Sequence, residues 1–221
     1  SPLVVSNRTV NASDAISAPY LVSAPGLCHY VPMITGLRLC ATHRHRVRHP
    51  RDIAFKTGIN AIVGPNGTGK STILRVLHSC SDCVVERDGE GETVPFHSEG
   101  DNPQIEGYRA GSRLETILQT RGLFASHGQI MRDVLATLPF APGDTLLLDE
   151  PEAGQDLAWI EGIHQGLADI SRELGVQVIM ATHHPAFWFQ ANLIELAPNY
   201  ARETLRRYRK YLQEPDYHLN F

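Results

Sequence analysis

The sequence predicts an α/β fold with a mostly parallel central sheet, an N-terminal antiparallel β layer and a short helical lobe. Short apolar runs at residues 59–63, 145–148 and 176–180 are typical of buried strands. Between the last two runs, residues 155–174 form an amphipathic helical pattern that ends at Gly175. Residues 36–42 alternate with a period of two and predict a half-exposed strand ahead of the core. This alternation of strands and helices indicates a parallel sheet covered on both faces.

The sequence also predicts shorter strands and helices between these elements. We expect further strands at residues 52–55 and 193–196. Residues 84–86 and 93–96 flank an acidic, glycine-rich segment, residues 88–92, that is expected to be an exposed turn. Helical patterning at residues 113–122 and 129–138 predicts the short lobe.

The amino-acid composition is typical of some classes of protein and argues against others. The 221 residues are 42% hydrophobic and 20% charged, which is ordinary for a globular chain with one substantial core. No apolar run reaches the ~18 residues of a membrane helix, so we expect no direct membrane insertion and no signal peptide. A net charge of −4 argues against a surface that binds nucleic acid everywhere. The four cysteines are expected to be thiols in a cytoplasmic, reducing compartment.

The most specific motif is a glycine-rich loop at residues 64–72, between a predicted buried strand and a predicted helix. It matches the G-x-x-x-x-G-K-[ST] pattern, whose glycines let successive N–H groups face one concavity that prefers a polyphosphate. We expect Lys70 to reach the β- and γ-phosphates and the Ser71 hydroxyl to ligate Mg²⁺. The candidate ATP-binding residues are Gly64, Pro65, Asn66, Gly67, Thr68, Gly69, Lys70, Ser71 and Thr72.

Two carboxylates follow the buried run at residues 146–148. Strand carboxyl ends in a parallel sheet open into the ligand crevice, so Asp149 and Glu150 are expected beside the phosphate loop. We expect Asp149 to hold Mg²⁺ through its second shell and Glu150 to orient and polarise the attacking water. The alternative is that both acids simply cap the next segment.

A histidine stands at the end of the next predicted strand. Residues 178–183 deliver His183 to the same rim, where it could hydrogen-bond the γ-phosphate. His184 follows directly and is the rival candidate. A single histidine at a strand end is commonly structural.

Together these motifs resemble the core of the ABC-type ATPases of the P-loop NTPase class. The matching segments are residues 64–72, residues 147–154 (Leu-Leu-Asp-Glu-Pro-Glu-Ala-Gly) and residues 181–185 (Ala-Thr-His-His-Pro). The Asp-Glu-Pro-Glu form is similar to compact stand-alone AAA-type ATPases related to the SMC and recombination-repair group. The resemblance implies an N-terminal extension (1–35), an ABC-type ATPase domain (36–198) and a C-terminal helix packed on it (199–221).

The resemblance also implies a cofactor set, ATP with Mg²⁺, and a head-to-tail homodimer formed on ATP or a heteromeric partner subunit. The partner copy would contribute a signature segment, for which the nearest match is Ser126, His127, Gly128 and Gln129. Asp156 suits the loop that crosses the dimer interface. Gln104 is the candidate for the glutamine that couples Mg²⁺ to a partner. Helix capping is the alternative role for Ser126.

Two basic stretches leave a nucleic-acid role open. Residues 43–51 hold four arginines and residues 206–210 form a basic C-terminal patch, although solvated surface explains both more simply. A histidine or arginine among residues 43–45 is also our candidate for stacking on adenine.

Cys80 and Cys83, with His78 nearby, resemble half of a metal site. A structural zinc needs four ligands, and we find no second pair at matching spacing. We therefore expect ordinary thiols at the end of the loop helix.

Three hypotheses for the function follow. The first is a soluble ATPase that closes as a dimer on ATP and drives an unknown protein effector. The second is the ATP-binding subunit of a transporter, associated with the membrane through its partner. The third is a nucleic-acid-binding repair or defence ATPase.

Overall fold

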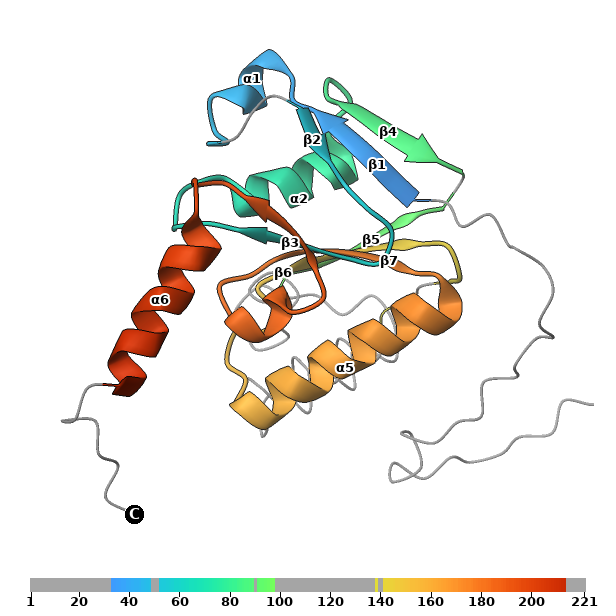
Figure 1. The fold of residues 1–221 in the computed structure, drawn as a ribbon. Coiled ribbons are helices and arrows are strands. Elements are labelled where there is room, and N and C mark those ends of the chain that lie inside the picture. Colours follow the sequence, from blue (N-terminus) through green and yellow to red (C-terminus); the bar gives the residue numbers. More distant parts are fainter. Residues whose placement is uncertain (1–32, 49–51, 90, 98–137, 139–140, 214–221) are drawn as a thin grey trace, which may run out of the picture.

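Two sheets form the centre of the part of the chain that the structure describes (Figure 1). The computed structural model describes residues 33–48, 52–89, 91–97, 138 and 141–213. The larger sheet has five parallel strands in the order β5-β6-β7-β3-β8. These strands are β3 (Ile59–Val63), β5 (Thr93–His97), β6 (Thr145–Asp149), β7 (Gln177–Ala181) and β8 (Asn192–Glu195).

The smaller sheet is antiparallel, with the order β2-β1-β4. Its strands are β1 (Met33–Arg38), β2 (Asp52–Ala54) and β4 (Val84–Asp88). The predicted combination of a parallel core with an antiparallel layer is confirmed, whereas the expected helical lobe lies outside the described residues.

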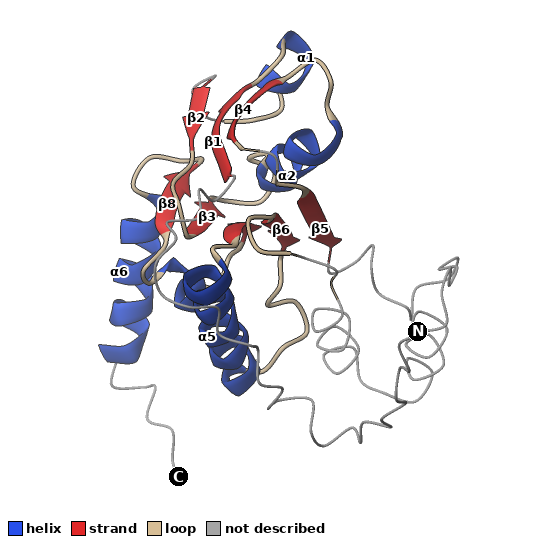
Figure 2. Cartoon of the chain, turned by 90° about the vertical axis from the view of Figure 1, so that its right-hand side faces the viewer, coloured by secondary structure: helices blue, strands red, loops and turns tan. Residues whose placement is uncertain are grey.

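Helices fill the space between and below the sheets. Helix α2 (Lys70–Ser79) lies between the two sheets, and α5 (Leu157–Leu174) covers the opposite face of the parallel sheet (Figures 1 and 2). The short α1 (Ala41–Arg44) follows β1, and a 3₁₀ turn, η1 (Pro185–Trp188), follows β7. The chain thus has helices on both faces of the parallel sheet.

The core strands divide their side chains between two hydrophobic clusters because successive residues of a strand point to opposite faces. In β6, Leu147 belongs to the cluster on the α2 side, while Leu146 and Leu148 face α5. In β7, Ile179 likewise faces α2 and its neighbours face α5. Continuous apolar runs therefore reflect burial on both faces, and the strand ends are held rigidly where polar residues follow.

The connection between the sheets differs from the local pattern in the sequence. The segments expected to flank an exposed acidic turn enter different sheets: β4 pairs with β1, whereas β5 forms the edge of the parallel sheet beside β6. Pro95 is tolerated in β5 because an edge strand needs fewer ladder hydrogen bonds. The first predicted strand also ends early, since the chain turns at Cys40 into α1.

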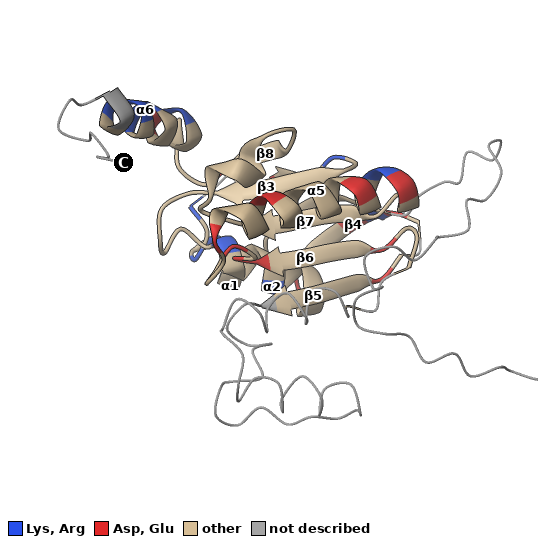
Figure 3. Cartoon of the chain, turned by 90° about the horizontal axis from the view of Figure 1, so that it is seen from below, with Lys and Arg blue, Asp and Glu red and all other residues tan. Residues whose placement is uncertain are grey.

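The last helix, α6 (Tyr200–Gln213), packs only through its beginning. Ala201 is buried and Leu205 half-buried against the α5-side cluster, whereas Tyr208 and Tyr211 are exposed. Basic residues run along the helix (Figure 3). Within the described ranges, every helix is too short or too polar to span a lipid bilayer.

Candidate functional site

The carboxyl ends of β3, β7 and β6 bring the three predicted motifs to one edge of the sheet. Strand β7 lies between the other two, and its Ala181 pairs with Ile62 of β3 and Asp149 of β6. The phosphate loop leaves β3, the two acids end β6, and His183 follows β7. Parallel pairing therefore makes one site from segments far apart in the sequence.

The phosphate loop has the backbone shape that its glycines predict. Gly67 and Gly69 have φ values of 73° and 100°, in the left-handed region. A Cβ on Gly69 would lie 2.5 Å from the Arg46 carbonyl oxygen, so this position needs glycine for space as well as conformation. Because α2 begins at Lys70, its unpaired N-terminal N–H groups face the loop, as an anion site requires.

The Lys70 side chain is held inside the loop by carbonyl oxygens of the loop itself. Its side chain is buried, and Nζ donates to the carbonyl oxygens of Gly64 and Pro65 at 3.2 and 3.3 Å. Burial lowers the pKa of Lys70, and the carboxylates of Glu150 and Asp149 oppose that shift. The charged amino group of Lys70 is therefore partly removed from water at the place where a phosphate would bind.

The phosphate loop and the acidic strand end are in direct contact. The Ser71 hydroxyl donates a 3.0 Å hydrogen bond to Oδ1 of Asp149, 78 residues away. A hydroxyl and a carboxylate at this separation provide the oxygen ligands that Mg²⁺ prefers. Both residues fit the predicted metal site.

Glu150 and His183 face each other across the site. His183 Nε2 lies 3.6 Å from Glu150 Oε1, and this nitrogen is buried with no hydrogen-bond partner among the described residues. Glu150 has a φ of 51°, unusual for a residue with a side chain. Such strain clusters at functional positions, where it aims a side chain. A phosphate oxygen at the site would satisfy the orphaned nitrogen, so the residues present fit a nucleotide triphosphate.

Sequence reasoning missed Glu152 as a positioning residue. Its Oε1 accepts hydrogen bonds from the Thr182 hydroxyl at 2.8 Å and from the His183 backbone N–H at 2.7 Å. It therefore connects the acidic segment to the histidine segment and fixes the latter's backbone. Glu152 is visible in the sequence as the last acid of Asp-Glu-Pro-Glu. Its role is not, because its hydrogen-bond partners lie 30 and 31 residues further along the chain.

The remaining predicted residues are placed as follows. His184 accepts a 3.2 Å hydrogen bond from the Ala186 N–H and caps η1, which leaves His183 as the histidine at the site. Asp156 caps α5 by accepting from the Trp159 N–H at 3.1 Å. The predictions for Gln104 and for residues 126–129 lie outside the described residues.

Comparisons with known proteins agree with the fold that carries these residues. A family model described as an AAA domain matches residues 37–108. CbiO1 from Clostridium perfringens, described as part of the ABC transporter complex cbiONQ, has a similar structure with a TM-score of 0.54. The match has 19% sequence identity and covers 85% of this chain and 96% of CbiO1. In its fold the chain is similar to the ABC-type P-loop ATPases.

Two curated proteins that are similar to this chain in sequence are named as ATP-binding proteins for export or import. The cytochrome c biogenesis ATP-binding export protein CcmA of Alkalilimnicola ehrlichii is 28% identical over 205 residues, covering 76% of this chain and 85% of CcmA. The aliphatic sulfonates import ATP-binding protein SsuB 1 of Rhodococcus jostii is 29% identical over 180 residues, covering 68% of this chain and 74% of SsuB 1. The predicted resemblance to the ABC type is confirmed, and the narrower likeness to stand-alone SMC-related ATPases stays a prediction.

The charges and burial around His183 predict the direction in which its pKa is shifted. Burial lowers its pKa below the ordinary 6.5, and the positive charge of Lys70 lowers it further. In an NMR titration of the nucleotide-free protein we expect a His183 midpoint below 6.5, rising in Lys70→Met. The exposed Lys56→Met is the matched control and should leave the midpoint unchanged.

The lowered pKa of His183 makes the folded protein less stable in acid. The unfolded chain takes up this proton near pH 6.5 and the folded chain only at lower pH, so the contribution of His183 destabilises the fold as pH falls below 6.5. Above that pH it contributes nothing. A wild-type midpoint at or above 6.5, or one unaffected by Lys70→Met, would contradict this account.

Proposed function

We propose that this chain binds Mg-ATP at residues 64–72 and hydrolyses its terminal phosphate. The observation that carries the proposal is the 3.0 Å hydrogen bond between Ser71 and Asp149. It joins the phosphate loop to the acidic strand end and places together the two side chains that would hold the Mg²⁺ of Mg-ATP.

Each side chain has a distinct role in the proposed reaction. Lys70 would exchange its two carbonyl acceptors for phosphate oxygens. Ser71 would ligate the cation, and Asp149 would orient its water ligands. Bound Mg²⁺ supplies positive charge against the charge that develops on the transferring phosphoryl group. Glu150 would accept a hydrogen bond from the attacking water, and His183 Nε2–H would donate to the γ-phosphate.

The site is proposed to be completed by a second copy or a related subunit on binding of ATP. Residues 126–129 of the other copy would contact the γ-phosphate, and Asp156 would lie at the interface. Exposed apolar side chains beside Asp156 support this placement: Leu157 is 60% exposed and Trp159 is 44% exposed. Large apolar groups exposed together are common at interaction surfaces.

The partner that the ATPase drives distinguishes two candidate functions. The names of the two relatives favour an ATP-binding subunit of a transporter. We propose that such a subunit would dock on its membrane protein near Gln104. The alternative is a stand-alone ATPase acting on an unidentified protein effector. A nucleic-acid partner has less support, because the net charge is −4. Co-purification of a membrane subunit with the chain would decide for the transporter.

Metal dependence tests the proposal directly. We expect phosphate release from ATP to stop when Mg²⁺ is omitted and to return when it is restored. Asp149→Asn should weaken the response to Mg²⁺ by about 10–100-fold, the usual cost of losing an outer-shell partner. The exposed Asp88→Asn in β4 is the control and should titrate like wild type. Metal-independent hydrolysis, or equal Mg²⁺ responses in both variants, would refute the proposed metal site.

A further inference from the structure

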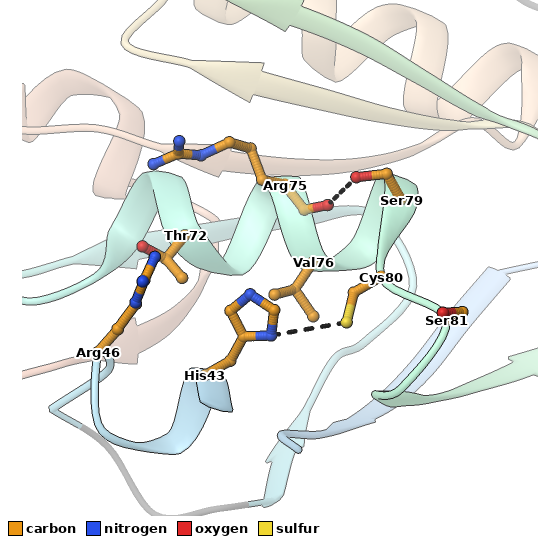
Figure 4. A pocket seen from close by; sticks show the side chains of 8 residues that line it. All are labelled: His43, Arg46, Thr72, Arg75, Val76, Ser79, Cys80 and Ser81. Atoms are coloured by element: carbon orange, nitrogen blue, oxygen red, sulfur yellow. Dashed lines mark hydrogen bonds between the residues drawn. The ribbon is translucent and has the colours of Figure 1, made fainter. Parts of the chain in front are cut away.

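A second cluster of ligand-type side chains lies away from the phosphate site. Cys40 is the N-cap of α1 and His43 lies within that helix, while Cys80 and Cys83 follow the end of α2. Their potential ligand atoms, three sulfurs and one ring nitrogen, all lie within 4.8 Å of one another. Figure 4 shows His43 reaching from α1 toward Cys80. Each pair has ligands three residues apart, so the chain holds the second pair that sequence reasoning did not find.

The distances inside the cluster match a four-ligand cage. The Nδ1 atom of His43 lies 3.2 Å from the Cys40 sulfur and 3.6 Å from the sulfurs of Cys80 and Cys83. With Zn–S bonds of about 2.3 Å and Zn–N bonds of about 2.0–2.1 Å, tetrahedral ligands lie roughly 3.5–3.8 Å apart. The ring nitrogen is thus already near the separation that a shared zinc ion would impose.

The fold explains why two distant pairs meet. Strands β1 and β4 are paired with Arg38 opposite Val84, so the residues just beyond, Cys40 and Cys83, are brought together. The Cys40 N–H points at the Cys83 sulfur at 3.2 Å. The single turn of α1, closed by the Arg44 N–H on the Cys40 carbonyl at 3.0 Å, returns His43 to the same place.

The types of ligand atom indicate which metal the cluster would bind. Three thiolates and an imidazole form a soft, closed set typical of structural zinc, with no open position for a substrate. The three cysteines are free thiols rather than disulfide partners. Cys83 is buried, whereas Cys80 and His43 line a surface pocket through which an ion could enter. We propose that Cys40, His43, Cys80 and Cys83 bind one Zn²⁺ as a structural site.

The site would fasten the antiparallel layer to the phosphate-loop helix. Beyond His43 the chain packs on the loop itself: the Arg48 N–H donates to the Thr68 carbonyl at 3.0 Å, and Gly69 lies against Arg46. Zinc would hold this same segment at the other end of α2. It would therefore stabilise the frame on which the phosphate loop is built, and its presence does not depend on ATP hydrolysis.

The test measures metal bound to the full chain purified and dialysed under reducing conditions. Elemental analysis is expected to find one zinc per chain, released in proportion when the thiols are titrated with a mercurial in the presence of a zinc-sensitive dye. Co²⁺ in place of Zn²⁺ should give the visible bands of a tetrahedral site and thiolate charge transfer. Cys83→Ser and His43→Ala should lose or weaken binding.

His78→Ala provides the matched control. His78 is exposed, lies close to Cys80 in sequence and contacts Thr93 at 3.4 Å, so its variant should keep the full metal content. If Cys83→Ser does not fold, the cobalt spectrum of the wild type still decides. Wild-type protein that takes up neither Zn²⁺ nor Co²⁺, or shows an octahedral spectrum without thiolate bands, would overturn the inference. Retention of full zinc by both ligand variants would also overturn it.

Discussion

Glu150→Gln is expected to slow ATP hydrolysis by about 10²–10⁴-fold, the range associated with loss of a positioned general base. The substitution keeps the size of the side chain and its place beside His183, where the carboxylate oxygen now lies 3.6 Å from Nε2. It removes the negative charge and the ability of this side chain to accept a proton from water. Nucleotide binding should persist, because Lys70 and the loop amides are unchanged. Phosphate-release assays at saturating Mg-ATP measure the expected loss.

The same variant tests the proposed dimer. If opening depends on hydrolysis, Glu150→Gln should accumulate as an ATP-bound dimer, seen by light scattering during size-exclusion chromatography. Glu161→Gln, an exposed position on α5, should hydrolyse ATP like wild type and not accumulate the dimer. Wild-type hydrolysis by Glu150→Gln would remove the proposed role of this carboxylate. A slow variant that stays monomeric would keep that role and count against dimer closure by this chain alone.

Sequence reasoning located the parts of the site whose signal is local. The phosphate loop is recognised from one short segment, residues 64–72. Asp149, Glu150 and His183 each follow a continuous apolar run. Parallel strands carry such ends to a common edge, so the order of strands and helices along the chain is enough to predict that these residues meet. The contact between Ser71 and Asp149 follows from that same topology.

The parts that were missed depend on pairings between distant segments. Cys40 and His43 were not recognised as partners of Cys80 and Cys83, because only the register of β1 with β4 brings them together. His78 was the nearer histidine in sequence, yet α2 directs it toward Thr93. The sequence also did not predict that β4 and β5 belong to different sheets. A half-exposed strand has the same alternation of apolar and polar residues in either sheet.

Lys70→Ala is expected to abolish detectable Mg-ATP binding or weaken it greatly. Removing one partner of a buried, hydrogen-bonded charge pair costs about 2–5 kcal/mol, which corresponds to roughly 30- to 4,000-fold in affinity. The loop amides would remain, but they would lack the one side-chain cation that the described loop aims at the phosphates. Isothermal calorimetry with Mg-ATP measures the change, and the exposed Lys56→Ala should bind like wild type.

The fold itself is not expected to suffer from Lys70→Ala. Burial lowers the pKa of Lys70, which means that its charge is desolvated at a free-energy cost in the nucleotide-free protein. Removing the side chain should therefore leave the Tm unchanged or raise it while binding is lost. Opposite movements of stability and affinity would show that this lysine is kept for its ligand. Undiminished heat of Mg-ATP binding in Lys70→Ala would place the nucleotide elsewhere and refute the proposed function.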